Sequence, residues 1–580
     1  MTFPKLKYRP YLVLFSIFAF AVVAHGQSEL EAKCDSVFAS MNNTHSSGVA
    51  VTVIQNGKVL AKKSYGLASI EHQVPFTHQS VVRINYSEGR EFISIAAVLM
   101  EMDGKVDLND RVRKYFPELP AWSDKVTVWD LLNHRSGFVD EWATVLLTQA
   151  NMANRFDKSQ FLRLLYTQPR PEIVPGKGYM YSNSDFGLLR LVLEKASGEK
   201  LSAWMKKRMF EPLKMKSTRQ WDDQLAVIPN FARQYTDEGD NRFKIKHADK
   251  TSPGSNYFIA TSADDLALWA AAHADEKSDI SKATAKLLKN VRLMPNNKDH
   301  YIFGHTVEKV AGQTRIFHRG VGEDLYLTRV PELGLVLITL GNRQPGFEVE
   351  NKALLNYILK TPDSTTAKST FLTKPIAVTN EELARYEGRY LFQDQATWQS
   401  YVPMRRTNDF FVSDGVLKVR FSGDLVYSLT PVGKGVFYAY EEGFGTQVTF
   451  SQTMPGSPLE ARLDFDDGFP SIRMKKEPNI WAPTKAELSS FIGKYYSKHL
   501  DYYWTIMLNA DGKLIVRRPT IADMELIPDL KNEFRLTMED RVNHGFDVWV
   551  RFDRDAKGKI AHITAHYPRL MDHRFDLVSK

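Results

Sequence analysis

Strand patterns open and close the first part of this chain, and helical periodicity separates them. Apolar and polar residues alternate over residues 48–67 on both sides of Asn56-Gly57, a dipeptide typical of a β-hairpin turn. Helical spacing dominates residues 92–272, strand patterns return over residues 315–340, and a last helix is predicted at residues 348–359. This order favours a sheet assembled from both ends of the unit, covered by helices and carrying a helical lobe. Spacing alone does not establish the topology.

A sequence repeat follows a linker in the last third of the chain. Residues 362–370 are small and polar, as is typical of a linker. The segment 382–390 recurs as 487–495, and each copy is followed by a strand-turn-strand pattern, at 414–420 and at 511–517. The repeat predicts two small antiparallel β-barrels or sandwiches, and closed barrels would leave no exposed sheet edge.

The first 26 residues have the three parts of a secretory signal peptide. Three cations lie within the first nine residues, residues 11–23 form a short apolar run, and Ala24-His25-Gly26 is a small-x-small cleavage site. We expect a periplasmic or secreted chain that begins near Gln27 and has no stable membrane span after cleavage. A retained N-terminal anchor is the alternative. The sole cysteine, Cys34, has no partner for an internal disulfide.

Composition narrows the classes of function. A chain of 580 residues is too long for one hydrophobic core, which predicts several domains. The net charge of +8 arises from basic residues interspersed with acidic ones, so no nucleic-acid partner is expected. The histidines lack the spacings of a metal site, and no glycine-rich phosphate loop precedes a helix. We therefore expect neither a metal nor a cofactor.

Three short segments lie in a fixed order within the first unit: Ser87-Glu88-Gly89-Arg90, Tyr181-Ser182-Asn183 and His318-Arg319-Gly320. They resemble the catalytic motifs of the serine β-lactamase and penicillin-binding protein superfamily, S-x-x-K, Y-x-N and H-x-G. Other segments that look like landmarks of this superfamily follow in the right order: residues 104–105, 131–137, 175–176, 194–198, 211–213 and 261–266. The resemblance implies a class C β-lactamase-related serine hydrolase with the β-lactamase/transpeptidase-like fold.

The patterns and the resemblance together predict an α+β multidomain chain. Its expected segments are a signal peptide at 1–26, a β-lactamase-like serine hydrolase domain at 27–361, a linker at 362–380, and lipocalin-like β domains at 381–480 and 484–580. The β domains are similar to modules often appended to such hydrolases. The hydrolase domain carries all three motifs.

The resemblance assigns a role to each motif residue. Ser87 is the expected nucleophile and stands just before the helix predicted at 92–102, where backbone N–H groups and the helix dipole favour a developing oxyanion. Tyr181 is the expected base. A phenol is a weak acid, so cations nearby must favour its phenolate if it is to act near neutral pH.

Asn183, His318 and Gly320 are the expected substrate-binding residues. A lysine in place of His318 would bind the carboxylate of a β-lactam or of a peptidoglycan stem peptide, whereas a neutral histidine offers a donor without permanent charge. The H-x-G form therefore favours an esterase or peptidase over a β-lactamase. We expect a small-molecule or peptide substrate, with cell-wall fragments as candidates.

Arg90 departs from the family pattern, which has lysine at this position. Arginine cannot serve as a proton shuttle, although its fixed charge can still favour a phenolate. Two hypotheses stay open: an exported hydrolase of esters or small peptide amides that acts through an acyl-Ser87 intermediate, and an inactive relative that binds peptidoglycan-derived or other small ligands. The literal S-x-x-K match, Ser197 to Lys200, follows Tyr181 and so breaks the required order; we expect it to be non-catalytic.

Overall fold

The computed structural model describes residues 29–84, 86–148, 157–223, 226–240, 242–246, 258–289, 292–293, 300–302, 304–310, 312–317, 324–344, 346–361, 374–393, 407–422, 425–441, 444–465, 471–477, 481–518, 521–538, 546–567 and 569–580. The expected signal peptide lies outside this part of the chain. Within it, no helix combines the length and the apolar character needed to cross a membrane.

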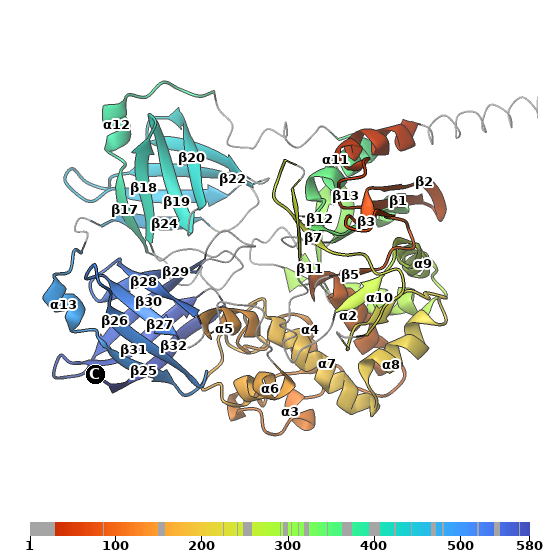
Figure 1. The fold of residues 1–580 in the computed structure, drawn as a ribbon, viewed down its shortest axis with the longest axis horizontal. Coiled ribbons are helices and arrows are strands. Elements are labelled where there is room, and N and C mark those ends of the chain that lie inside the picture. Colours follow the sequence, from red (N-terminus) through yellow and green to blue (C-terminus); the bar gives the residue numbers. More distant parts are fainter. Residues whose placement is uncertain are drawn as a thin grey trace, which may run out of the picture.

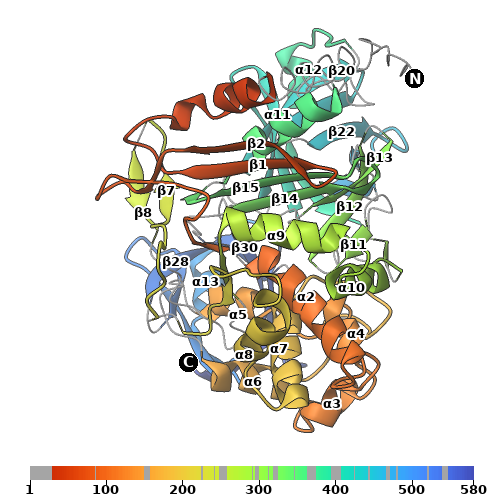
Figure 2. The same ribbon diagram turned by 90° about the vertical axis from the view of Figure 1, so that its right-hand side faces the viewer.

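An eight-stranded antiparallel sheet forms the centre of the first unit, in the order β10-β11-β12-β13-β14-β15-β1-β2 (Figure 2). Strand β1 pairs with β15 from Val49 opposite Gly341 to Gln55 opposite Leu335, so the two ends of the unit meet within one sheet. The strands are β1 Val49–Gln55, β2 Lys58–Tyr65, β10 Arg292–Leu293, β11 His300–Ile302, β12 His305–Val310, β13 Gln313–Phe317, β14 Leu325–Val330 and β15 Leu335–Gly341. The sequence pattern favoured such a sheet, assembled from both ends of the unit.

Helices cover both faces of the sheet, and for that reason six successive residues of β1 are buried. Val49, Val51 and Val53 belong to the core beneath α11 (Glu348–Leu359). Ala50 points the other way, into the core that includes α9 (Ala263–Ala274). Figure 2 shows α11 and α9 on opposite sides of the strands.

Helix α2 (Tyr86–Met102) is the buried helix that carries the first motif. The expected helix start at residue 92 is wrong, because the helix begins at Tyr86 and Ser87 lies in its first turn. Tertiary packing outweighs the weak helix propensity of this segment. Strand β5 (Val82–Ile84) is held in a three-stranded sheet immediately before the helix, and Phe92 stacks on Trp269 with 4.6 Å between ring centroids.

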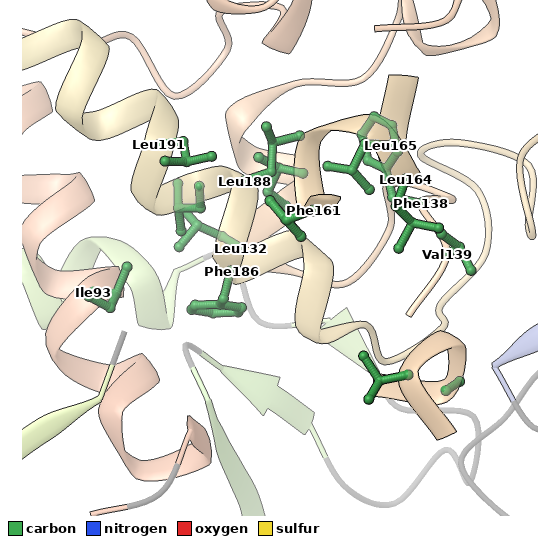
Figure 3. Close-up of a cluster of buried hydrophobic side chains, with 14 of the residues drawn as sticks. Ile93, Leu132, Phe138, Val139, Phe161, Leu164, Leu165, Phe186, Leu188 and Leu191 are labelled. Carbon is green, nitrogen blue, oxygen red and sulfur yellow. The ribbon is translucent and has the colours of Figure 1, made fainter. Parts of the chain in front are cut away.

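A helical lobe is formed by residues that lie in the chain between strands β1–β2 and strands β10–β15 of the sheet. Its helices are α3 Val112–Tyr115, α4 Val128–Leu132, α5 Glu141–Thr148, α6 Lys158–Tyr166, α7 Asn183–Ser197 and α8 Leu201–Met205. Figure 3 shows side chains such as Phe161, Leu164 and Leu188 converging in its apolar core. Helix α10 (Asp279–Leu288) packs on α2 beside the sheet. The packing of α2 and α7 in this core positions the first turns of both helices, and both first turns contain motif residues.

Two closed antiparallel barrels follow, each of eight strands (Figure 1). The first contains β17 Gly388–Phe392, β18 Thr407–Ser413, β19 Val416–Ser422, β20 Leu425–Gly433, β21 Val436–Glu441, β22 Phe444–Ser451, β23 Glu460–Phe465 and β24 Ile472–Lys476. The second contains β25 Gly493–Ser497, β26 Tyr502–Leu508, β27 Leu514–Arg518, β28 Ile521–Pro528, β29 Glu533–Met538, β30 Phe546–Arg554, β31 Ile560–Tyr567 and β32 Leu570–Ser579. The expected α+β class with two β modules is confirmed.

The sequence repeat corresponds to the same structural unit in both barrels. A short helix, α12 (Asn380–Ala384) or α13 (Lys485–Ser489), precedes the first strand of each barrel. The hydroxyl of the buried Tyr390 donates to the Tyr386 carbonyl at 3.0 Å, and that of Tyr495 donates to the Phe491 carbonyl at 2.8 Å. The repeated tyrosines therefore make the same contact, with a carbonyl four residues earlier, at the first strand of each barrel.

The second barrel is docked on the helical lobe, beside α5 and α6 (Figure 1). Arg163 Nη2 donates to the Leu500 carbonyl at 3.0 Å, and His499 Nε2 lies 2.8 Å from the Leu164 carbonyl oxygen. Apolar side chains of this barrel and of the lobe belong to one continuous core. The docking brings the turn between β31 and β32 next to the start of α5.

Candidate active site

The first motif places a buried arginine at the start of α2. Arg90 is fully buried, one turn after the beginning of the helix. The side chain of Ser87 lies outside the described part of the chain, as do His318 and Gly320. The structure therefore describes three of the six expected site residues in full: Arg90, Tyr181 and Asn183.

These three residues are in direct contact. Arg90 Nη1 donates to the Tyr181 hydroxyl, and Arg90 Nη2 donates to Asn183 Oδ1 at 2.7 Å. Asn183 is the first residue of α7, so the beginnings of α2 and α7 face each other. The guanidinium carbon of Arg90 is also 4.3 Å from the Tyr181 ring centroid. One arginine thus fixes both the phenol and the amide of the second motif.

A fully buried carboxylate supports the amide from the other side. Asn183 Nδ2 donates to Asp140, at 3.1 Å from Oδ1 and 3.2 Å from Oδ2. Asp140 stands immediately before α5, and its Oδ1 accepts the Trp142 backbone N–H at 2.8 Å, which is the bond of a helix cap. No sequence signal selects Asp140, because an aspartate at a helix start is ordinarily only a cap.

The second barrel contributes a second arginine to the same place. Arg569, in the turn between β31 and β32, has Nη1 3.3 Å from Asp140 Oδ2. Its guanidinium carbon lies 4.7 Å from the Tyr181 ring centroid. Two guanidinium groups, from Arg90 and Arg569, therefore lie against Tyr181, and one of them belongs to a different domain.

A histidine and an aspartate behind Tyr181 add little charge. His134 Nδ1 accepts the Ser182 backbone N–H at 3.2 Å, and its ring lies 4.6 Å from that of Tyr181. Burial, with Arg90 and Arg569 nearby, holds the pKa of His134 well below its usual value. Burial raises the pKa of Asp185 well above its usual value, and Ser136 donates to its carboxyl. Both groups are thus favoured in their neutral forms, and the charges beside Tyr181 come from the arginines and Asp140.

The literal S-x-x-K segment does not join this group. Ser197 is the last residue of α7, at the opposite end of the helix from Asn183, and its hydroxyl bonds to the carbonyls of Glu194 and Glu199. The side chain of Lys200 is 81% exposed. Among the residues that the structure describes, no group of three or more His, Cys, Asp or Glu side chains is placed to hold a metal ion.

Known proteins match both the fold and the motif region. The family model Beta-lactamase matches residues 35–359. Penicillin-binding protein 4* of Bacillus subtilis is 25% identical over 377 residues, covering 62% of this chain and 82% of that protein. The D-aminopeptidase of Brucella anthropi is 29% identical over 171 residues, and the match covers 29% of this chain and 32% of that enzyme.

A solved structure supports the same fold. The octameric penicillin-binding protein homologue from Pyrococcus abyssi superimposes with a TM-score of 0.51 at 18% sequence identity, covering 77% of this chain and 99% of that one. At this identity the likeness concerns the fold alone. Since the family model spans more than half of the chain and includes all three motifs, the resemblance inferred from those motifs is confirmed: this chain belongs to the beta-lactamase family.

Proposed function

We propose that the protein is an exported serine hydrolase that cleaves an ester or a small peptide amide through an acyl-Ser87 intermediate. One observation carries this proposal: Arg90 keeps a fixed cation bonded to the Tyr181 hydroxyl and to Asn183. The electrostatic part of the missing lysine's role is therefore retained. The family membership and the D-aminopeptidase among the relatives support hydrolysis of small amides.

The reaction divides between the residues as follows. Tyr181, as phenolate beside Arg90, takes the proton of the Ser87 hydroxyl while Ser87 Oγ bonds to the carbonyl carbon. The carbonyl oxygen becomes an oxyanion, and backbone N–H groups at the start of α2 stabilise it. The tetrahedral intermediate then expels its alkoxide or amine, which receives the proton from Tyr181. Water, deprotonated by Tyr181 in turn, releases the acid and restores Ser87.

Arg90 takes no part in these proton transfers, because a guanidinium stays protonated in a protein. Its task is to hold the phenolate and to orient the Asn183 amide, which with His318 and Gly320 would position the substrate. A neutral histidine at position 318 favours an ester, or an amide without a carboxylate at this position, over a β-lactam, whose carboxylate a lysine would bind. Cell-wall peptides are candidate substrates in the compartment to which the signal peptide would send the chain.

The alternative is a protein that binds such ligands without cleaving them. The observation that favours it is also Arg90, because the family's proton-transferring lysine is absent. The two functions differ in one measurable respect, since only the hydrolase forms a covalent bond at Ser87.

Intact-mass spectrometry after incubation with a fluorophosphonate and, separately, with a penicillin tests the proposal. We expect one adduct per chain with the fluorophosphonate, absent in Ser87→Ala. Tyr181→Phe should slow adduct formation while leaving the fold intact. A folded protein that takes up no adduct from either reagent would leave the binding protein as the better description.

A further inference from the structure

The start of β32, directly after Arg569, is bonded to the helical lobe through both backbone groups of Met571. The Met571 N–H donates to Glu172 Oε2 at 2.8 Å, and Arg170 Nη2 donates to the Met571 carbonyl at 3.1 Å. Arg569 itself has φ +68°, in the left-handed region that side chains seldom adopt. A residue stays in such a strained conformation only when the surrounding structure holds it, and here the two bonds of Met571 hold the chain next to Arg569. The position of Arg569 is therefore determined by the docked barrel.

The contacts around Tyr181 form a closed ring of five side chains. Arg90 bonds to Tyr181 and to Asn183, Asn183 bonds to Asp140, Asp140 pairs with Arg569, and Arg569 lies over the ring of Tyr181. Four of these residues come from the first unit, and the fifth comes from the second barrel. The three motifs contain Arg90, Tyr181 and Asn183, whereas Asp140 and Arg569 lie outside them.

The buried negative charge of Asp140 explains why the ring includes Arg569. The Asp140 side chain has no exposed surface, and a buried carboxylate is costly unless a cation compensates it. Arg569 supplies that cation at 3.3 Å, while its own side chain remains 32% exposed at the edge of the site. Loss of Arg569 would leave the Asp140 charge uncompensated and would first affect the orientation of Asn183, whose amide is bonded to both Asp140 oxygens.

We propose that Arg569 is a positioning residue of the active site, supplied by the second barrel. It compensates Asp140, so that Asp140 orients Asn183, and it places a second permanent positive charge beside Tyr181. The consequence for catalysis rests on the proposed hydrolase function. The charge that one lysine supplies in the family is here divided between two arginines, and activity then depends on a docked second barrel.

Kinetics on an aryl ester such as p-nitrophenyl acetate test the proposal with three single variants and one double variant. Arg569→Ala should lower kcat on the order of 10- to 100-fold with little change in KM, since a displaced orienting group costs about this much. Arg569→Lys should recover part of the loss. Arg574→Ala, which removes an exposed arginine paired with Asp576 on the same hairpin, should match the unmodified protein.

Two readouts separate positioning from general stability. The Arg569→Ala, Asp140→Asn double variant should be no slower than Arg569→Ala alone, because both changes act through one contact. The second readout is the recovery in Arg569→Lys, because a restored cation can again pair with Asp140. An Arg569→Ala protein with the kinetics of Arg574→Ala would overturn the proposal.

Amide hydrogen exchange tests the same contact without relying on turnover. Exchange over residues 138–141 and 179–186 should be faster in Arg569→Ala than in Arg574→Ala. If the unmodified protein neither turns over ester nor acylates at Ser87, the hydrolase function fails, and exchange alone then decides whether Arg569 holds Asp140 and Asn183. Equal exchange in the two variants would refute the positioning role in either case.

Discussion

Replacing Glu172 by glutamine should stabilise the docked second barrel, and by more at pH 8 than at pH 5. Glu172 Oε2 accepts the Met571 N–H at 2.8 Å, directly beside the turn that carries Arg569. Its side chain is buried, and burial raises its pKa from 4.5 to about 7. Glutamine keeps an oxygen acceptor for Met571 but cannot ionise, so the variant removes the cost of a buried negative charge.

The size of the effect follows from the pKa of Glu172. Its value in the docked state lies above its value in the exposed state, so the carboxyl favours docking below about pH 4.5 and loses that contribution as the pH rises through 7. A rise in pKa from 4.5 to about 7 corresponds to about 3 kcal/mol, since one unit is about 1.4 kcal/mol. The gap between the variant and the unmodified protein should approach this value at pH 8 and fall below about 1 kcal/mol at pH 5.

Amide exchange of the peptide around Met571 measures this opening free energy. The protection factor should be about 100-fold higher in Glu172→Gln at pH 8 and less than about 5-fold higher at pH 5. His499 and His573 titrate at the same interface in both proteins, so their contributions cancel in the difference. Glu276→Gln, an exposed change, is the control. A gap that is equal at the two pH values, or that widens toward pH 5, would refute the reasoning.

Four further outcomes follow from other contacts. Burial lowers the pKa of His499 to about 4, so its contribution to docking is present above about pH 6.5 and is lost as the pH falls. Between pH 7 and 5 the docking free energy should therefore fall by about 2 kcal/mol, and amide exchange should show no such fall in His499→Gln. Thr127→Ala removes the side-chain cap of α4 and should lower the free energy of unfolding by about 1 kcal/mol, as read from urea denaturation. Leu188→Ala empties part of the lobe core in Figure 3 and should cost about 2–5 kcal/mol, seen as a lower calorimetric Tm; an unchanged Tm would contradict this packing. Tyr181→Phe should slow acylation of Ser87 by on the order of 100-fold or more, whereas an unaffected rate would exclude Tyr181 as the base.

The sequence predicted the elements whose signals are local. The hairpin around Asn56-Gly57 has its strands at 49–55 and 58–65, within the expected 48–67, and the helix at 348–359 has the expected bounds. Both are predictable because turn dipeptides and apolar periodicity act over a few residues. The start of α2 was not predictable in this way. Ser87 and its neighbours have weak helix propensity, and the helix extends through them because β5 and the packing of Phe92 hold its first turn.

The sequence by itself determined the family, the order of the domains' patterns and the identity of the motif residues Arg90, Tyr181 and Asn183, because these signals are contained in short segments of the chain. Only the tertiary structure decided that Asp140 and Arg569 complete the group. These two residues are 429 positions apart in the chain. No periodicity or spacing encodes such a contact, since it depends on how an entire barrel buries its surface against the helical lobe.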